Sequence, residues 1–232
     1  MKKFYKEVRA EKIKGGFQIA LDARTVKTPG KGTLIIPTRA LADAVAGEWR
    51  AQGDNIIAET MPLTRLINTV IDRVKPRFEL VAQEITAFAE TDLLCYRAGE
   101  PDDLSVKENQ TWNPFLEWAR ETFGAVLQTT SGVMPIKQDE ATLAILAAEV
   151  RAYDAFELTA LHEFTNGFGS LVLALAYMKE FCVFENCWQA SILHQKHQEA
   201  LWGEDLEVTE KRAALLRDLN TACQFISHLR NK

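Results

Sequence analysis

Two histidines near the C-terminal end of the sequence have the spacing best suited to chemistry. His194 and His197 are three residues apart, so on a helix their imidazole rings would lie on one face. Imidazole is a common ligand of transition metals, and Glu199, His162 or Cys187 would have to complete such a site. A metal site needs several converging ligands, and this segment supplies only two. We therefore expect no bound metal, and a small metal-dependent enzyme that uses the His194/His197 face stays open as an alternative.

A pair of carboxylates, Glu90 and Asp92, is the other arrangement that could transfer protons. The two residues are two positions apart, so their side chains would not face each other on a helix. Capping and hydrogen bonding to the neighbouring backbone explain them better. Cys95 has only Arg97 nearby to activate its thiol, and a single thiol of this kind is more often a core residue. These residues do not form a catalytic set.

The sequence also lacks the motifs of common nucleotide-binding and hydrolytic enzymes. It contains no GxGxxG, GxxxxGK[ST], GxSxG or HExxH pattern. We therefore expect no enzymatic activity and no cofactor. What remains is a binding protein.

Composition narrows the class of partner and compartment. The 232 residues carry 27 Lys and Arg against 32 Asp and Glu, a net charge of −5, which disfavours nucleic acid as a partner. The cysteine spacing fits neither a disulfide framework nor a zinc motif, so we expect reduced thiols, mostly buried, in a cytosol-like compartment. The four cysteines are Cys95, Cys182, Cys187 and Cys223.

Targeting and membrane segments are not evident. The first 17 residues lack the apolar stretch of a secretory signal. The most apolar run, Leu171–Met178, is far shorter than the roughly 20 residues of a transmembrane helix. We expect no membrane insertion and a bacterial cytoplasmic location, or the mitochondrial matrix if the chain is a trimmed organellar form.

The elements that must position the candidate residues begin with a small antiparallel sheet of hairpins. Phe17, Ile19 and Leu21 alternate with polar or small residues, which is the pattern of a half-buried strand. Turn residues separate four expected strands, at 4–8, 16–21, 24–28 and 33–37. Thr38 should then cap a helix that ends near Gln52 and buries Leu41, Val45 and Trp49.

The segment from Met61 to Arg97 organises the rest of the chain. Pro62 suits the first turn of a helix, whereas Pro76 should end or kink it and move Lys75 out of the α region. The expected buried stripe of this first helix is Leu63, Leu66, Ile67, Val70, Ile71 and Val74. A second helix should bury Leu80, Val81, Ile85 and Phe88.

Further helices should follow the 99–103 loop. The first should span 104–123, with a break at Asn113-Pro114, and the second should begin after Asp139 as its cap. The remaining three are expected at 157–179, at 187–202 and from 207 or 209 to 229. Gly167 and Gly169 should mark a close approach of another backbone, or a break, in the helix at 157–179. The predicted fold is α+β, with a small N-terminal antiparallel β unit at residues 1–58 and a larger, mainly helical domain at residues 59–232.

The best candidate for a partner-facing surface is the segment from Gln195 to Gly203. It is polar for a helix, yet it ends in Trp202 and Gly203. Exposed aromatic side chains often anchor interfaces. The alternative is that Trp202 packs against the last helical turn.

Four motifs in order resemble one family. They are MPLTRLINTVIDRV from Met61, AETDLLCYR from Ala89, QTWNPFLEW from Gln110, and Gln198 four residues before Trp202-Gly203. The chain is similar, from Phe4 to about Leu229, to the assembly chaperones that hold the α subunit of F1-ATPase before it enters the catalytic head.

The resemblance implies a function without catalysis. Such a chaperone covers an assembly surface of the unassembled α subunit and prevents its aggregation until the β subunit replaces it. We expect a monomer that binds the F1 α subunit. Candidate contacts are Glu90, Asp92, Gln195, Gln198, Glu199, Trp202 and Gly203.

One departure from the family pattern concerns the same helix. Relatives carry an Asp-Glu pair at the positions of His194 and Gln195, and an acidic residue in that helix is associated with function in the family. Glu199, Glu204 or Asp205 could supply negative charge nearby.

Overall fold

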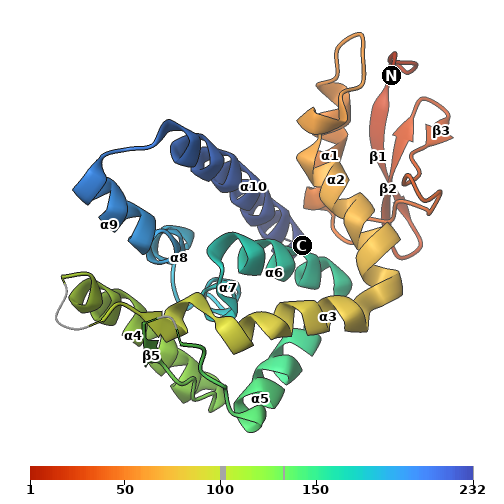
Figure 1. Cartoon of the computed structure of the whole chain (residues 1–232). Coiled ribbons are helices and arrows are strands. Elements are labelled where there is room, and N and C mark those ends of the chain that lie inside the picture. The colour runs from red at the N-terminus through yellow and green to blue at the C-terminus, as the bar shows by residue number, and fades with distance from the viewer. Residues whose placement is uncertain (100–102, 133, 232) are drawn as a thin grey trace. The chain divides into compact units, whose positions relative to one another are not determined.

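The computed structural model describes residues 1–99, 103–132 and 134–231. The chain forms two compact units (Figure 1). Unit 1 comprises Met1–Phe78, Ala155–Ala160 and Asn220–Lys232, and unit 2 comprises Glu79–Asp154 and Leu161–Leu219. The boundary expected at residue 58 therefore falls inside unit 1, because the helical segment that follows the sheet belongs to the same unit.

The predicted α+β class is confirmed, since a small antiparallel sheet precedes a mostly helical chain. In the sheet, β1 (Val8–Ile13) pairs with β2 (Gly16–Leu21), and β2 pairs with β3 (Arg24–Thr25). Gly16 is needed at the first hairpin, because a Cβ there would lie 2.4 Å from the carbonyl oxygen of Ile36. That approach allows Phe17 and Ile36 to exchange two backbone hydrogen bonds of 2.8 Å.

Three of the four expected strands are wrong in position or extent. The first strand begins at Val8 rather than Phe4, and the third stops at Thr25. Residues 33–37 form only isolated bridges, Lys27 to Thr33 and Phe17 to Ile36. Period-two alternation predicts extended backbone, and the extent of pairing depends on partners that the alternation does not specify.

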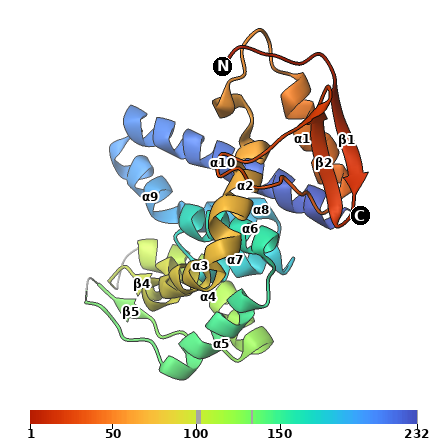
Figure 2. The same ribbon diagram turned by 90° about the vertical axis from the view of Figure 1, so that its right-hand side faces the viewer.

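Helix α1 (Arg39–Arg50) packs on the sheet within unit 1, as both views show (Figures 1 and 2). Thr38 caps it as predicted, accepting a hydrogen bond from Leu41 N at 3.3 Å, and the expected apolar stripe is buried. Glu48 on α1 then caps α2 (Pro62–Thr69), because its carboxylate accepts bonds from Leu63 N and Thr64 N. The carboxylate thereby satisfies two of the free N–H groups at the start of α2.

Pro76 changes the helix type instead of ending the helix. A π-helical turn (Val70–Val74) and a 3-10 turn (Lys75–Arg77) lead directly into α3 (Phe78–Ala87). Lys75 keeps α-helical angles (φ −53°, ψ −49°), so the expectation that it leaves the α region is wrong. A changed hydrogen-bond register accommodates the N–H that proline lacks.

The helix stripes are partly as predicted. In the stripe predicted from Leu63 to Val74, Leu66 and Ile71 are half-buried and the other members are buried. On α3, Ile85 is buried, whereas Leu80 is 49% exposed, so its predicted place in the core is wrong. Ala82 and Ala89 occupy the core side instead.

In unit 2, α3 leads through the 3-10 turns Phe88–Thr91 and Leu93–Cys95 into the short strand β4 (Tyr96–Arg97). β4 pairs in parallel with β5 (Thr130–Ser131). Of the expected 99–103 loop, residues 100–102 lie outside the described part. Helix α4 (Asp103–Phe123) continues through Pro114, so the predicted break is wrong; Trp112, Phe115 and Ala119 are buried on both sides of the proline.

The single helix expected at 157–179 is two helices. After α5 (Glu140–Arg151), α6 (Ala155–Phe168) ends before Gly169, which takes a left-handed φ of +66°. Ser170 then caps α7 (Leu171–Met178) by accepting a bond from Leu173 N at 3.0 Å. Gly169 thus makes the break that the sequence left open. Gly167 makes the close approach, because a Cβ there would lie 2.5 Å from the Leu219 side chain.

The expected helix at 187–202 is also divided. It forms α8 (Phe184–Ser191) and α9 (Leu193–Trp202), separated at Ile192. Helix α10 (Leu206–Arg230) closes the chain as predicted, and its first part lies in unit 2. Among the described residues, no helix combines the length and the apolar composition that crossing a membrane requires.

Candidate partner-binding surface

Helix α9 ends in a sharp corner that two residues define. Gly203 has a φ of +85° and donates its N–H to Glu199 O at 2.9 Å, which stops the helix as predicted. Asp205 Oδ1 accepts bonds from Glu207 N at 2.8 Å and Val208 N at 3.3 Å, and so starts α10. Glycine and aspartate together allow the chain to leave one helix and enter the next within a few residues.

This corner exposes large apolar side chains. Trp202 is 77% exposed, Leu206 73% and Leu201 60%, and Val208 is exposed to a lesser degree. We call residues 201–208 the α9–α10 corner; all of them are classed as exposed. Scattered single apolar residues are normal on a surface, but a local group of large ones is typical of an interaction site. The alternative that Trp202 packs against its own helix is wrong.

Glu199 lies beneath the corner and joins the two helices. Its carboxylate accepts a bond from Lys196 Nζ at 2.8 Å and forms an ion pair with Arg212 on α10. The Glu199 and Arg212 side chains are both largely covered. The bonds from Lys196 and Arg212 hold the pKa of Glu199 below its ordinary value, so its carboxylate is ionised at neutral pH. Glu199 therefore fixes the angle between α9 and α10, whereas Gln195 and Gln198 on α9 are exposed to solvent.

One of the two histidines of α9, His194, contacts buried residues of α4. His194 Nε2 lies 2.5 Å from Glu108 Oε1, and the ring centroids of His194 and Trp112 are 5.0 Å apart. Glu108 is fully buried and also accepts a bond from Ala98 N. Over residues 1–99, 103–132 and 134–231, His, Cys, Asp and Glu side chains nowhere gather in groups of three or more that could hold a metal.

The two carboxylates of the AETDLLCYR segment differ completely in environment. Glu90 is exposed, whereas Asp92 is fully buried. Asp92 accepts bonds from Leu94 N at 3.0 Å and from Val172 N at 3.1 Å, and thereby ties the segment to the start of α7. Burial raises the pKa of Asp92 to about 6, against the lowering effect of these hydrogen bonds. The backbone-bonding role expected for Asp92 is confirmed, and its side chain has no exposed surface for a partner in this conformation.

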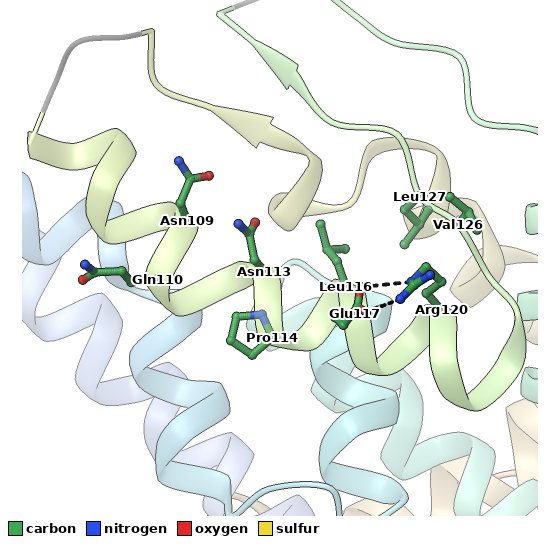
Figure 3. Close-up of a pocket in the computed structure, with 9 residues that line it drawn as sticks. All are labelled: Asn109, Gln110, Asn113, Pro114, Leu116, Glu117, Arg120, Val126 and Leu127. Carbon is green, nitrogen blue, oxygen red and sulfur yellow. Dashed lines mark hydrogen bonds and ion pairs between the residues drawn. The ribbon is translucent and has the colours of Figure 1, made fainter.

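The QTWNPFLEW motif lies on α4 and uses both sides of that helix. Trp112 and Phe115 point into the core, and the Trp112 indole donates to Ala190 O at 2.9 Å. On the other side the helix borders an open groove of about 610 Å³ (Figure 3). The groove residues are Asn109, Gln110, Asn113, Pro114, Leu116, Glu117, Arg120, Val126 and Leu127.

Sequence reasoning missed this groove. The polar positions between the aromatic ones were a signal that α4 has an outer face, but the sequence did not indicate that Val126 and Leu127 would form the opposite wall. Glu117 and Arg120 form an ion pair at one end, as the dashed lines in Figure 3 show.

Comparison with known proteins identifies the family. A model of the family described as "ATP12 chaperone protein" matches residues 2–120. The chain belongs to the ATP12 chaperone family.

Solved structures of ATP12 proteins match over nearly the whole chain. Atp12 from Paracoccus denitrificans is 37% identical, with 99% of this chain and 98% of that chain covered and a TM-score of 0.94. An aspartate-to-lysine variant of Atp12p from P. denitrificans gives the same identity and coverage with a TM-score of 0.95. The Atu1473 protein of Agrobacterium tumefaciens, described as a candidate chaperone, is 37% identical, with 99% and 86% covered and a TM-score of 0.93.

Membership of the ATP12 family decides between the classes of function that the sequence left open. The family consists of chaperones for ATP synthase assembly and not of enzymes, so the metal-dependent enzyme is set aside and the chaperone class predicted from the sequence is confirmed. The solved relatives come from bacteria.

Proposed function

We propose that this chain binds the unassembled α subunit of F1-ATPase through the α9–α10 corner and prevents its aggregation until it pairs with the β subunit. The observation that carries the proposal is the exposure of Leu201, Trp202 and Leu206 within a few residues of one another. A protein of an assembly-chaperone family needs such an apolar surface, because its client exposes an apolar interface before assembly.

The client's own chemistry explains both binding and release. A surface that is buried permanently in the finished complex is more hydrophobic than an ordinary surface. Side chains such as Trp202 and Leu206 would cover part of it. A β subunit that buried a larger area of the same surface would displace the chaperone by competition without any chemical step.

The candidate residues then have different roles. Trp202 contacts the client, Gly203 sets the corner, and Gln195 and Gln198 lie at its polar edge. Glu199 acts indirectly, by holding α9 against α10 through Arg212. Glu90 would be a separate, peripheral contact. Asp92 supports the interior.

The direct test is co-purification with isolated α subunit, with β subunit as the control. We expect a complex with α alone, one chaperone per α subunit, suppression of light scattering by α, and dissociation when β is added. Failure to bind α at micromolar concentrations would contradict the proposal and favour an adaptor with another client. Size-exclusion chromatography with light scattering of the free chain tests the expected monomer.

A matched pair of substitutions tests the surface itself. Leu206→Ala at the corner should weaken α binding, whereas Leu80→Ala on α3, which is 49% exposed, should leave it unchanged. Glu199→Gln should weaken binding less than Leu206→Ala, and Gln195→Ala should have the smallest effect of the corner variants. Equal effects of Leu206→Ala and Leu80→Ala would show that the corner is not the binding surface.

We infer that the protein works where F1 is assembled. For relatives from bacteria this is the cytoplasm, and for a trimmed organellar form it would be the mitochondrial matrix. Fractionation of the source cells with the α subunit as marker tests this inference.

A further inference from the structure

Two thiols in unit 2 lie close enough to react with each other. The Sγ atoms of Cys182 and Cys187 are 3.0 Å apart. Cys182 lies in the connection between α7 and α8, and Cys187 lies in α8. Neither forms a disulfide. The sequence spacing of these cysteines indicated reduced, mostly buried thiols, so this juxtaposition is a feature of the folded chain.

The two thiols have unequal access to solvent. Cys182 is half-buried, whereas Cys187 is fully buried. The hydrogen bond with Cys187 lowers the pKa of Cys182, with burial acting in the opposite direction. The thiolate is the reactive form of cysteine. Cys182 is therefore suited to react first with an oxidant, and Cys187 to resolve the product.

Cys95 provides the contrast within the same unit. It is fully buried, and burial raises the pKa of its thiol to about 12. A thiol of this kind stays protonated and does not react readily. Unit 2 thus contains one unreactive cysteine, Cys95, and one pair, Cys182 and Cys187, placed to react with each other.

The connection between α7 and α8, which carries Cys182, packs against α4. Phe181 stacks on Trp118 of α4, with ring centroids 5.0 Å apart, and meets Phe115 edge-on at 6.0 Å. Glu180 adopts a left-handed φ of +61° in the same turn. The Sγ atom of Cys187 also lies 3.4 Å from Leu173 O of α7. A covalent change at these sulfurs therefore acts on the packing among α4, α7 and α8.

We propose that Cys182 and Cys187 form a reversible intramolecular disulfide, which makes the α7–α8 connection a redox-modification site. The oxidant is a low-molecular-weight disulfide such as glutathione disulfide. This site is independent of the proposed client surface.

The reaction follows thiol–disulfide exchange. The Cys182 thiolate attacks one sulfur of glutathione disulfide, forms a mixed disulfide and releases one glutathione thiolate, which takes up a proton. The Cys187 sulfur then attacks the Cys182 sulfur, loses its proton and releases the second glutathione. In total, two protein thiols are oxidised and one glutathione disulfide is reduced to two glutathione molecules.

The test uses the whole reduced protein in an excess of glutathione disulfide, followed by alkylation of the remaining thiols and peptide mapping without reduction. We expect two of the four thiols to disappear, with one bond that joins Cys182 to Cys187, and we expect excess glutathione to reverse it. Alkylation of both Cys182 and Cys187 after this treatment would overturn the proposal, as would a bond to Cys95 or Cys223.

Single substitutions separate the two roles. Cys187→Ser should accumulate one glutathione per chain on Cys182, which traps the mixed disulfide. Cys182→Ser should leave Cys187 as a free thiol, because its sulfur is buried. Cys223→Ser is the control and should form the disulfide as the natural chain does. Loss of two thiols in Cys182→Ser would contradict the assignment even if Cys187→Ser failed to fold.

Discussion

Trp112 and Trp202 belong to the same unit, yet their surroundings are opposite. Trp112 has no exposed surface, its indole N–H is bonded to Ala190 O, and the Arg97 guanidinium lies 5.0 Å from its ring. Trp202, at the end of α9, is 77% exposed. In the interior of this unit apolar groups are covered, and the buried carboxylate of Asp92 accepts bonds from backbone N–H groups. At the α9–α10 corner the backbone is well capped, but the apolar side chains are not covered.

This difference separates the side chains that stabilise the unit from the side chains that are available to a partner. Leaving apolar area in water forgoes about 25 cal/mol for each Å² that burial would remove. The well-formed caps at Gly203 and Asp205 show that the corner is ordered structure and not a frayed end. An ordered surface that carries this unfavourable exposure is what a binding site requires. The variants below test this distinction between interior and corner.

The largest expected effect is on stability at Trp112. Trp112→Ala should lower the free energy of unfolding by about 3–5 kcal/mol, because it removes a large buried ring and leaves a cavity. Trp202→Ala should change it by less than about 0.5 kcal/mol, as for an ordinary surface substitution. Urea unfolding of both variants, followed by circular dichroism, measures the two values. Similar losses in the two variants would mean that Trp202 is packed in solution.

The next effect concerns Asp92 and pH. Burial raises its pKa in the folded chain to about 6, against an ordinary 3.8, so the folded state binds the proton more tightly than the unfolded state. This contribution to stability is fully present below about pH 4, declines as pH rises toward 6, and is lost above it, a change of about 3 kcal/mol at 1.36 kcal/mol per pKa unit.

Asp92→Asn isolates this contribution because the amide does not titrate. The difference in unfolding free energy between the natural chain and Asp92→Asn should fall between pH 4 and 6 and then stay level. Urea unfolding at several pH values measures it. A difference that is independent of pH would show that Asp92 does not titrate in the folded chain in this range.

The third effect is on client binding, for which Trp202 should be important although it contributes little to stability. Trp202→Ala should weaken binding to the F1 α subunit about 30-fold, which corresponds to about 2 kcal/mol for the loss of an aromatic anchor. Titration of labelled α subunit measures the dissociation constant, and Leu80→Ala serves as the control. Unchanged affinity in Trp202→Ala would separate exposure from binding and move the client site away from the corner.

Features decided by near neighbours could be predicted from the sequence. Thr38 as a cap, the buried stripe of α1 and the stop at Gly203 each depend on residues within a few positions, and all three are confirmed. The polar helix ending in Trp-Gly also identified the corner. A cap, a stripe and a stop are local events, so local patterns suffice for them.

Features decided by distant neighbours could not be predicted. The burial of Asp92 depends on Val172 N, eighty residues away. Leu80 fits the apolar spacing of α3, but it is 49% exposed in the folded chain. The groove along α4 required Val126 and Leu127 to return to that helix. Periodicity gives the direction of a side chain relative to its own helix and does not identify what lies opposite.

The smallest expected effect tests how closely the interior is packed, with two helical glycines. A methyl group at Gly167 of α6 would lie 2.5 Å from Leu219 Cδ2 and 3.0 Å from Leu219 Cγ. Leu219 is buried and has little room to move. A methyl group at Gly47 of α1 would meet nothing within 4 Å. The two positions therefore share a helical backbone and differ in their surroundings.

Gly47→Ala should raise the free energy of unfolding by about 0.5–1 kcal/mol, because alanine favours the helix. The same gain is available to Gly167→Ala, but overpacking against Leu219 costs about 1–3 kcal/mol, so that variant should be less stable by up to about 2 kcal/mol. Urea midpoints of the two variants give the comparison directly. If both substitutions stabilised the protein equally, the contact of α6 with Leu219 would be loose, and close packing could not distinguish the interior from the corner.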